Sequence, residues 1–295
     1  MAEKKVLKIM EFSDPLCTWC WGSEPMIRKI ETRFDNVEIE YVMGGMMQDV
    51  RSLFPESEDL AADIKEYNSK VAEAWNDSAL KHHMPNNGHL FNLFDEENVS
   101  TFPMARAYNA AQMEDQDKAF FLLRRFREMI FLEGKKPNAN ADMMQAVLEA
   151  GLDLGKFMER MENGEAEKAF LDDIEIVKKY QVTGFPAFNF VYDGQEVLVR
   201  EYMYYQTAES LIKGLSGGKL LENEISIDDI PKVMEKYKTM AVSELAFIFD
   251  LDYPTLNKEL KRLEEEGLIQ IVMYGDNRYL KHVNKGCNNG VCGIE

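Results

Sequence analysis

Two cysteines lie three residues apart between a predicted strand and a predicted helix, and this feature constrains the fold more than any other. Residues 6–12 are short and β-rich, which predicts a buried strand. Cys17 and Cys20 follow, and apolar residues then recur at helical spacing over residues 23–34. A second strand is predicted over 37–43. This order predicts a right-handed βαβ unit in a parallel sheet.

The next part of the chain combines a long helical stretch with two further strands. Helices are predicted at 59–80, 101–112, 117–132, 141–150, 154–161 and 165–180. Strands at 187–192 and 196–202 are joined by an Asp-Gly turn, and a helix over 207–215 follows. The pattern predicts an α/β domain over residues 1–217, with a large helical insertion at about 57–180.

The last part of the chain has a different pattern. It predicts three short helices and a hairpin, at 230–237, 243–249, 253–266, 268–274 and 278–283. This order is typical of a winged-helix unit, so we expect a small domain over 228–284. Residues 285–295 are expected to form a flexible tail that contains Cys287 and Cys292.

Charge and hydropathy exclude several classes of protein. The 295 residues carry a formal charge of −18, which repels nucleic acid and anionic membrane. No run of about 18 apolar residues predicts a membrane span, and no secretory signal is recognised. We therefore expect a cytoplasmic protein, in which a C-x-x-C is more often redox-active or metal-binding than structural.

The chemistry expected of the cysteine pair follows from its position. A thiolate is stabilised at a helix N-terminus, so Cys17 is predicted to attack a disulfide and Cys20 to resolve the mixed disulfide. A zinc site is less favoured, because the remaining candidate ligands lie far away in sequence, at His82, His83 and His89. A structural disulfide is favoured least. No metal is predicted.

Other residues near the pair have two interpretations each. Glu11 lies in the apolar first strand, where a carboxylate is costly unless it is used, so it is a candidate acceptor for the proton of Cys20. The alternative is an edge glutamate that faces solvent. Trp19 and Trp21 are candidates for an apolar rim that binds substrate peptide, or they pack in the interior.

Two sequence motifs carry a resemblance to a known family. The stretches "DPLCTWCWGSEP" and "TGFPAFNF" resemble the DsbA family of thioredoxin-fold proteins, and the first resembles its FrnE-like dithiol–disulfide isomerase branch. The resemblance covers about residues 4–217. It implies a cis proline at Pro186 that faces the cysteines, with Phe185 before it at the substrate site. It also implies that Glu11 corresponds to the buried acid of the superfamily.

These features together predict a cytoplasmic thiol–disulfide oxidoreductase or isomerase, acting on protein or small disulfides. No cofactor is required, because the electrons reside on sulfur. Expected partners are protein substrates and a thiol reductant such as glutathione or a thioredoxin system, and a homodimer is a further expectation. One alternative is a non-enzymatic adaptor that presents a client protein to a protease. Another is a redox-sensing regulator with a winged-helix output.

The C-terminal part leaves further alternatives open. Cys287 and Cys292 are candidates for a second dithiol, an inert tail, or a metal site with His282. Residues 228–284 carry 11 acidic and 8 basic residues, a net charge of −3. A DNA reader normally shows a basic surface, so a protein-interaction role is favoured over DNA binding.

Overall fold

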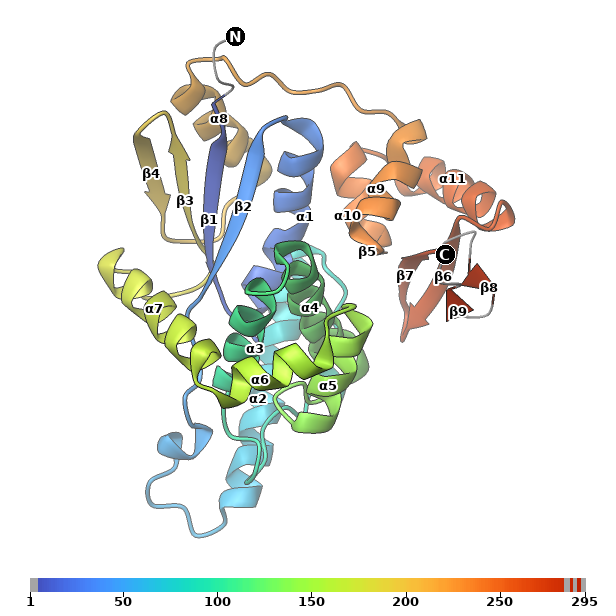
Figure 1. Cartoon of the computed structure of the whole chain (residues 1–295). Coiled ribbons are helices and arrows are strands. Elements are labelled where there is room, and N and C mark those ends of the chain that lie inside the picture. Colours follow the sequence, from blue (N-terminus) through green and yellow to red (C-terminus); the bar gives the residue numbers. More distant parts are fainter. Residues whose placement is uncertain (1–4, 284–286, 289–290, 293–295) are drawn as a thin grey trace.

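A mixed four-stranded sheet lies at the centre of the computed structural model, which describes residues 5–283, 287–288 and 291–292 (Figure 1). Its strands are β1 (Leu7–Ser13), β2 (Val37–Met43), β3 (Ala187–Tyr192) and β4 (Gln195–Val199). The strand order is β2-β1-β3-β4, with β1 parallel to β2 and antiparallel to β3. The inner strand β1 therefore leads directly from the middle of the sheet to the cysteine pair.

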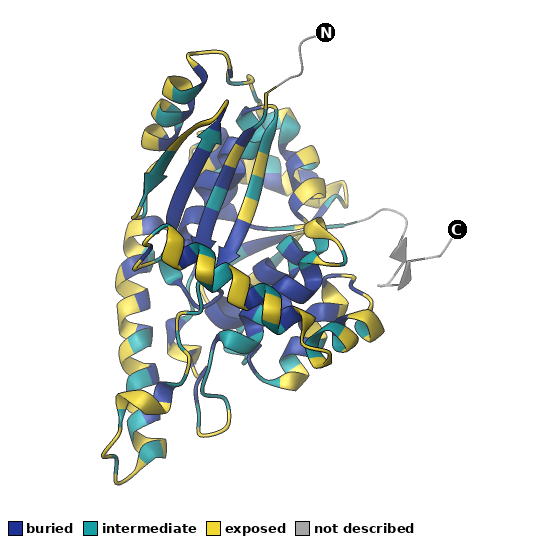
Figure 2. Ribbon diagram, turned by 60° about the vertical axis from the view of Figure 1, so that its left-hand side comes forward, coloured by how far each residue is buried: buried dark blue, intermediate teal, exposed yellow. Residues whose placement is uncertain are grey.

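Helices cover both faces of this sheet. The first face packs against α1 (Thr18–Arg33) and α8 (Tyr205–Ser216) through a shared apolar cluster. On the other face, Phe12 packs with Val177 of α7 (Glu165–Lys179). Figure 2 shows the inner strands as largely buried and α7 with an exposed outer side. The predicted α/β thioredoxin fold with a large helical insertion is confirmed.

The helical insertion consists of six helices and three short turns. The helices before α7 are α2 (Leu60–His82), α3 (Phe102–Gln112), α4 (Gln116–Glu128), α5 (Asn140–Glu149) and α6 (Leu154–Glu162). The turns are η1 (Val50–Leu53), η2 (Gly88–Leu90) and η3 (Met129–Glu133). None of the helices in the described ranges has both the length and the apolar character needed to cross a bilayer.

One predicted helix differs from the observed one. The helix expected over 117–132 ends as an α-helix at Glu128 and continues as the π-helical turn η3. Gly134 then reverses the chain with φ +65°, a conformation that glycine adopts at little cost. An added Cβ there would lie 2.7 Å from the Cβ of Leu90, so the close approach of η2 also requires glycine.

The C-terminal unit, residues 230–282, has its own core and sheet. It contains α9 (Ile230–Tyr237), β5 (Thr239–Ala241), α10 (Val242–Phe249), α11 (Tyr253–Glu265), β6 (Ile269–Tyr274) and β7 (Asn277–His282). The short turn η4 (Ile227–Asp229) precedes it. The sheet order is β5-β7-β6. The sequence does not predict strand β5, because three residues are too short to show the alternating pattern of a strand. The winged-helix assignment and the domain limits stay predictions.

The predicted tail is described only in part. The backbones of β8 (Cys287–Asn288) and β9 (Val291–Cys292) pair antiparallel, with Cys287 opposite Cys292. The other residues of the predicted flexible tail, and the side chains of both cysteines, lie outside the described residues. The second dithiol therefore stays a prediction.

Helix α1 is buried on all sides from Cys20 to Ile30. The sequence predicted one apolar face, but the C-terminal unit covers the other face through α10 (Figure 1). Glu24, Arg28 and Lys29 are therefore buried, and they pair with charged or carbonyl groups instead of water. Helix α1, which begins directly after Cys17, is thus one contact between the two parts of the chain, and Arg124 of α4, which pairs with Glu244, is another.

Candidate dithiol site

Cys17 occupies the N-cap of α1, where its sulfur meets the unpaired backbone groups of the helix. Its Sγ accepts a hydrogen bond from the backbone N–H of Cys20 at 3.2 Å and lies 3.4 Å from the carbonyl oxygen of Phe185, to which the thiol donates. The sulfur therefore lies at the N-terminal, positive end of the α1 dipole. Both cysteines are free thiols, and Cys17 is the more accessible of the two.

Cys20 lies one turn further into α1 and is fully buried. Burial raises the pKa of its thiol well above the ordinary value of 9.0, and the hydrogen bond with Cys17 and the nearby Glu11 carboxylate raise it further. Cys20 is therefore protonated at neutral pH and reacts only when a base removes its proton.

Glu11 lies on the inner strand β1 and is fully buried, so the alternative that it faces solvent is wrong. Its Oε1 accepts hydrogen bonds from the hydroxyls of Ser13 at 3.0 Å and Ser23 at 3.3 Å. Its Oε2 is buried without a hydrogen-bond partner among the described residues. Burial raises the pKa of Glu11 to about 7, and the Arg127 guanidinium at 4.0 Å opposes this shift. This carboxyl can therefore gain or lose a proton near neutral pH.

Arg127 was not predicted as part of the site. It comes from α4 in the helical insertion, is fully buried, and donates to the hydroxyl of Ser13 at 2.7 Å and to Glu24 at 2.7 Å. Its coulombic effect lowers the pKa of Cys20. In the sequence it is one of three arginines on a helix, and nothing in that pattern separates it from the others.

Asp14 holds the loop that leads into Cys17. Its two carboxylate oxygens accept from the backbone N–H groups of Leu16 at 2.9 Å and Met46 at 2.7 Å, and its own carbonyl accepts from the N–H of Cys17 at 3.1 Å. The side chain is fully buried, and burial raises its pKa to about 6. Asp14 therefore positions the backbone of the N-cap.

The Phe185–Pro186 peptide bond is cis, as the resemblance implied. The hydrogen bond from Cys17 to the carbonyl of Phe185 places this peptide beside the cysteine pair. The Phe185 ring lies against Gly44, where an added Cβ would be 1.8 Å from the ring. Gly44 therefore allows the close approach of this loop to the end of β2.

A shallow cavity of about 400 Å³ opens beside this loop, lined in part by Trp19, Pro186, Tyr202 and Tyr204. The Trp19 ring is half-buried, with the Tyr202 ring centroid 5.2 Å away. The strand predicted over 196–202 ends at Val199, so the following residues leave the sheet and reach this cavity. Trp19 therefore borders this cavity, and its role as a substrate contact stays a prediction.

Trp21 does not belong to such a rim, and this corrects the prediction. Its side chain is fully buried, its indole N–H donates to the carbonyl of Pro85 at 2.9 Å, and its ring stacks on Phe131 at 5.5 Å. Residues two apart on a helix face different directions. Because Trp19 lies at the surface, Trp21 points into the core of the helical insertion.

His82 at the end of α2 forms a directed hydrogen-bond chain with the residue after Cys17. Its Nδ1 accepts from the backbone N–H of Met84 at 3.1 Å, so its proton is on Nε2, 3.3 Å from the hydroxyl of Thr18. That hydroxyl lies 2.9 Å from Ser78 Oγ, which donates to a backbone carbonyl. Burial lowers the pKa of His82 to about 4, so it is neutral. The sequence placed His82 only as a weak zinc ligand, and the described residues contain no cluster that could hold a metal.

The chain matches a family model described as "Thioredoxin" over residues 10–210. Among curated relatives, the ClpXP adapter protein SpxH of Bacillus subtilis (strain 168) is 25% identical over 263 residues, which cover 88% of this chain and 84% of its own. SpxH of Halalkalibacterium halodurans is 24% identical over 287 residues, which cover 95% of this chain and 90% of its own.

Solved structures share the fold. A proposed protein disulfide isomerase from Nitrosomonas europaea superposes with a TM-score of 0.60 at 18% identity, covering 74% of this chain and all of its own. The cytosolic disulfide reductase DsbM from Pseudomonas aeruginosa superposes with a TM-score of 0.51 at 19% identity, covering 70% of this chain and 97% of its own. The FrnE-like branch stays a prediction. Since the family model spans more than half of the chain and includes both cysteines and the cis proline, the chain belongs to the thioredoxin family.

Proposed function

We propose that this protein is a thiol–disulfide oxidoreductase whose nucleophile is Cys17. The observation that carries the proposal is the place of its sulfur, which lies between the N–H of Cys20 and the carbonyl that precedes the cis proline. In the first step the Cys17 thiolate attacks a substrate disulfide. A Cys17–substrate disulfide forms, and the substrate's other sulfur leaves as a thiolate.

In the second step Cys20 attacks the sulfur of Cys17 and releases the second substrate thiolate. The substrate gains two electrons and the Cys17–Cys20 pair is oxidised to a disulfide. Cys20 must first lose its proton, and we assign Glu11 as the acceptor because its buried Oε2 has no hydrogen-bond partner among the described residues, its charge acts on the pKa of Cys20, and its own pKa is about 7.

The partners that we propose are proteins. The cavity beside Trp19 and Pro186 is shallow and open, as suits an extended peptide, and a thiol reductant in the cytoplasm would return the electrons. Nucleic acid is not favoured, because Lys261 and Arg262 on α11 pair with glutamates of the same helix.

Replacing Cys20 by alanine tests the proposal. In Cys20→Ala attack remains while resolution is removed, so incubation with insulin should leave insulin disulfide-linked to Cys17, detectable by mass spectrometry without reductant. Cys17→Ala is the matched control and should trap nothing. Equal trapping by both variants, or turnover of insulin disulfides that survives loss of both thiols, would contradict the assignment.

A second candidate function is favoured by the extent of the curated alignments. The relatives named ClpXP adapter proteins align over 263 and 287 residues, more than the stretch 10–210 of the family model, so they share residues outside the thioredoxin part. An adapter role would use binding rather than exchange. The test is the double variant Cys17→Ser, Cys20→Ser. If the protein is an adapter, this variant should still stimulate degradation of a bound client by ClpXP; if it acts only as an oxidoreductase, it should not.

A further inference from the structure

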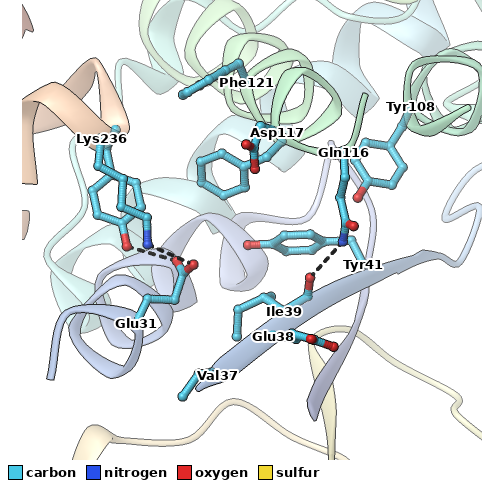
Figure 3. A pocket seen from close by; sticks show the side chains of 12 residues that line it. Glu31, Val37, Glu38, Ile39, Tyr41, Tyr108, Gln116, Asp117, Phe121 and Lys236 are labelled. Atoms are coloured by element: carbon cyan, nitrogen blue, oxygen red, sulfur yellow. Dashed lines mark hydrogen bonds and ion pairs between the residues drawn. The ribbon is translucent and has the colours of Figure 1, made fainter. Parts of the chain in front are cut away.

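A second cavity lies at the opposite end of α1 from the cysteine pair, where five elements meet (Figure 3). It has a volume of about 340 Å³ and is bordered by the end of α1, strand β2, helix α3, the start of α4 and α9. Glu31 borders it, 13 residues after Thr18, which corresponds to about 20 Å along a helix. This cavity is therefore separate from the dithiol site.

Aromatic rings form much of the wall of this cavity. The Tyr41 ring centroid lies 6.3 Å from that of Tyr108 and 6.1 Å from that of Phe120, and Phe120 lies 6.2 Å from Tyr237. Three of these rings already lie near a cation of the protein: the Arg28 guanidinium is 4.6 Å from the Tyr237 centroid and 5.8 Å from that of Phe120, and the Arg127 guanidinium is 5.9 Å from that of Tyr41. An aromatic wall of this kind favours a planar cation.

Tyr41 is buried, with only 4% of its surface exposed, yet its hydroxyl has no hydrogen-bond partner among the described residues. The other two tyrosines of the wall are paired: Tyr108 accepts from Gln112 at 3.1 Å, and Tyr237 donates to Glu31 at 2.9 Å. Figure 3 shows the Tyr41 hydroxyl directed into the cavity. A buried hydroxyl without a partner is costly, so this atom points to a ligand that completes it.

The charges around the cavity are predominantly negative. Its lining contains Glu31, Glu38 and Asp117 against the single cation Lys236. Lys236 is already engaged, because its Nζ donates to Glu31 at 3.1 Å. The Asp117 carboxylate is exposed to solvent and forms no ion pair or hydrogen bond with a side chain that the structure describes, and Figure 3 shows it beside the cavity. A cationic ligand would therefore find both an aromatic wall and a free carboxylate.

We infer that this cavity binds the guanidinium group of an arginine side chain carried by a partner protein. The group would donate to Tyr41 Oη and to the Asp117 carboxylate while its plane lies against the rings. Arginine suits the site better than lysine, because a guanidinium is planar, has five donors and is weakly hydrated. The inference does not rest on the proposed thiol chemistry, since the cavity contains neither cysteine.

The probe is acetyl-arginine methylamide, and acetyl-citrulline methylamide is its neutral isostere. Titration of the full chain, followed by transverse-relaxation-optimised NMR, should show saturable shifts around Tyr41 and Phe120 with the arginine probe. The citrulline probe should bind at least about tenfold more weakly, because it lacks the charge-assisted hydrogen bonds. Equal binding of the two probes would overturn the inference.

Variants locate the binding and separate it from the dithiol chemistry. Tyr41→Phe removes only the hydroxyl and Asp117→Asn only the charge, and each should weaken the arginine probe by about tenfold. Asp77→Asn, an exposed change on α2, is the matched control and should bind as wild type does. The double variant Cys17→Ser, Cys20→Ser should also bind normally. Unchanged affinity in both cavity variants, or tighter binding of free agmatine than of the peptide-like probe, would contradict the assignment.

Discussion

At the scale of single residues, the site depends on a buried acid whose charge is poorly tolerated. Glu11 is held by two hydroxyls and by Arg127 at 4.0 Å, yet burial dominates and raises its pKa from 4.5 to about 7. A carboxyl in this state costs stability when it ionises and is also able to accept a proton at neutral pH. Function and stability therefore oppose each other at this residue.

Glu11→Gln should make stability less sensitive to pH. The pKa of Glu11 is raised in the folded state. Its favourable contribution to the free energy of unfolding is therefore fully present below about pH 4.5 and is lost as the pH rises through about 7. Relative to wild type, the variant should gain about 3 kcal/mol between pH 4.5 and pH 8.5. Urea unfolding at both values measures this difference. In Glu97→Gln, an exposed control, the difference in unfolding free energy from wild type should be the same at both pH values. The same result for Glu11→Gln would refute the assignment.

At the scale of elements, the start of α1 is positioned by the end of α2. The neutral His82 contacts Thr18 through its Nε2 and packs edge-on against Trp19, with ring centroids 5.8 Å apart. Gly22 permits this contact, because an added Cβ would lie 2.4 Å from His82 Cγ. The insertion therefore helps to set the geometry of the cysteine pair.

Gly22→Ala should separate this steric role from helix propensity. The methyl group would force His82 away, so we expect a destabilisation of about 1–3 kcal/mol despite the better helix former. Gly214→Ala in α8 is the matched control, since nothing lies within 4 Å of its Cβ position, and it should stabilise by about 0.5–1 kcal/mol. Thermal unfolding of both variants gives the two signs. If Gly22→Ala instead stabilises the protein, His82 and the end of α2 can move away from the methyl group without a loss of stability.

At the scale of the whole molecule, a buried group of charges joins the dithiol domain to the C-terminal unit. Arg127, which lies beside Glu11, also pairs with Glu24. Arg28 in turn pairs with Glu24 at 3.3 Å and with Glu244 of α10 at 3.1 Å. Arg124 also pairs with Glu244, at 2.6 Å. These side chains are almost entirely excluded from solvent. The C-terminal unit is therefore part of the environment of α1 and not a separate appendage.

Glu244→Gln should destabilise the chain strongly. The change leaves Arg28 and Arg124 buried with less negative charge, and breaking a buried pair costs about 3–5 kcal/mol. The exposed pair of Glu265 with Lys261 provides the control, and Glu265→Gln should change stability very little. Chemical denaturation measures both, and limited proteolysis between residues 217 and 230 reports loss of docking. Equal stability of the two variants would exclude a role for the buried pairs.

The sequence alone determined the parts of this protein that depend on local pattern. The strand before Cys17, the helix after it, the strand over 37–43 and the turn at Asp193-Gly194 follow from periodicity and turn chemistry. The expected place of Pro186 came from a motif rather than from physics, and the cis bond agrees with it.

Only the tertiary structure decided which side chains meet. Arg127 reaches Glu11 from more than a hundred residues away, Trp21 turns into the core, and His82 contacts Thr18 rather than a metal. Glu24 and Arg28 are buried on α1 because arginines of α4 pair with Glu24 and Glu244 of the C-terminal unit pairs with Arg28. Periodicity reports the face on which a residue lies, whereas burial and pairing depend on what packs against that face, and distant segments of the chain supply those contacts.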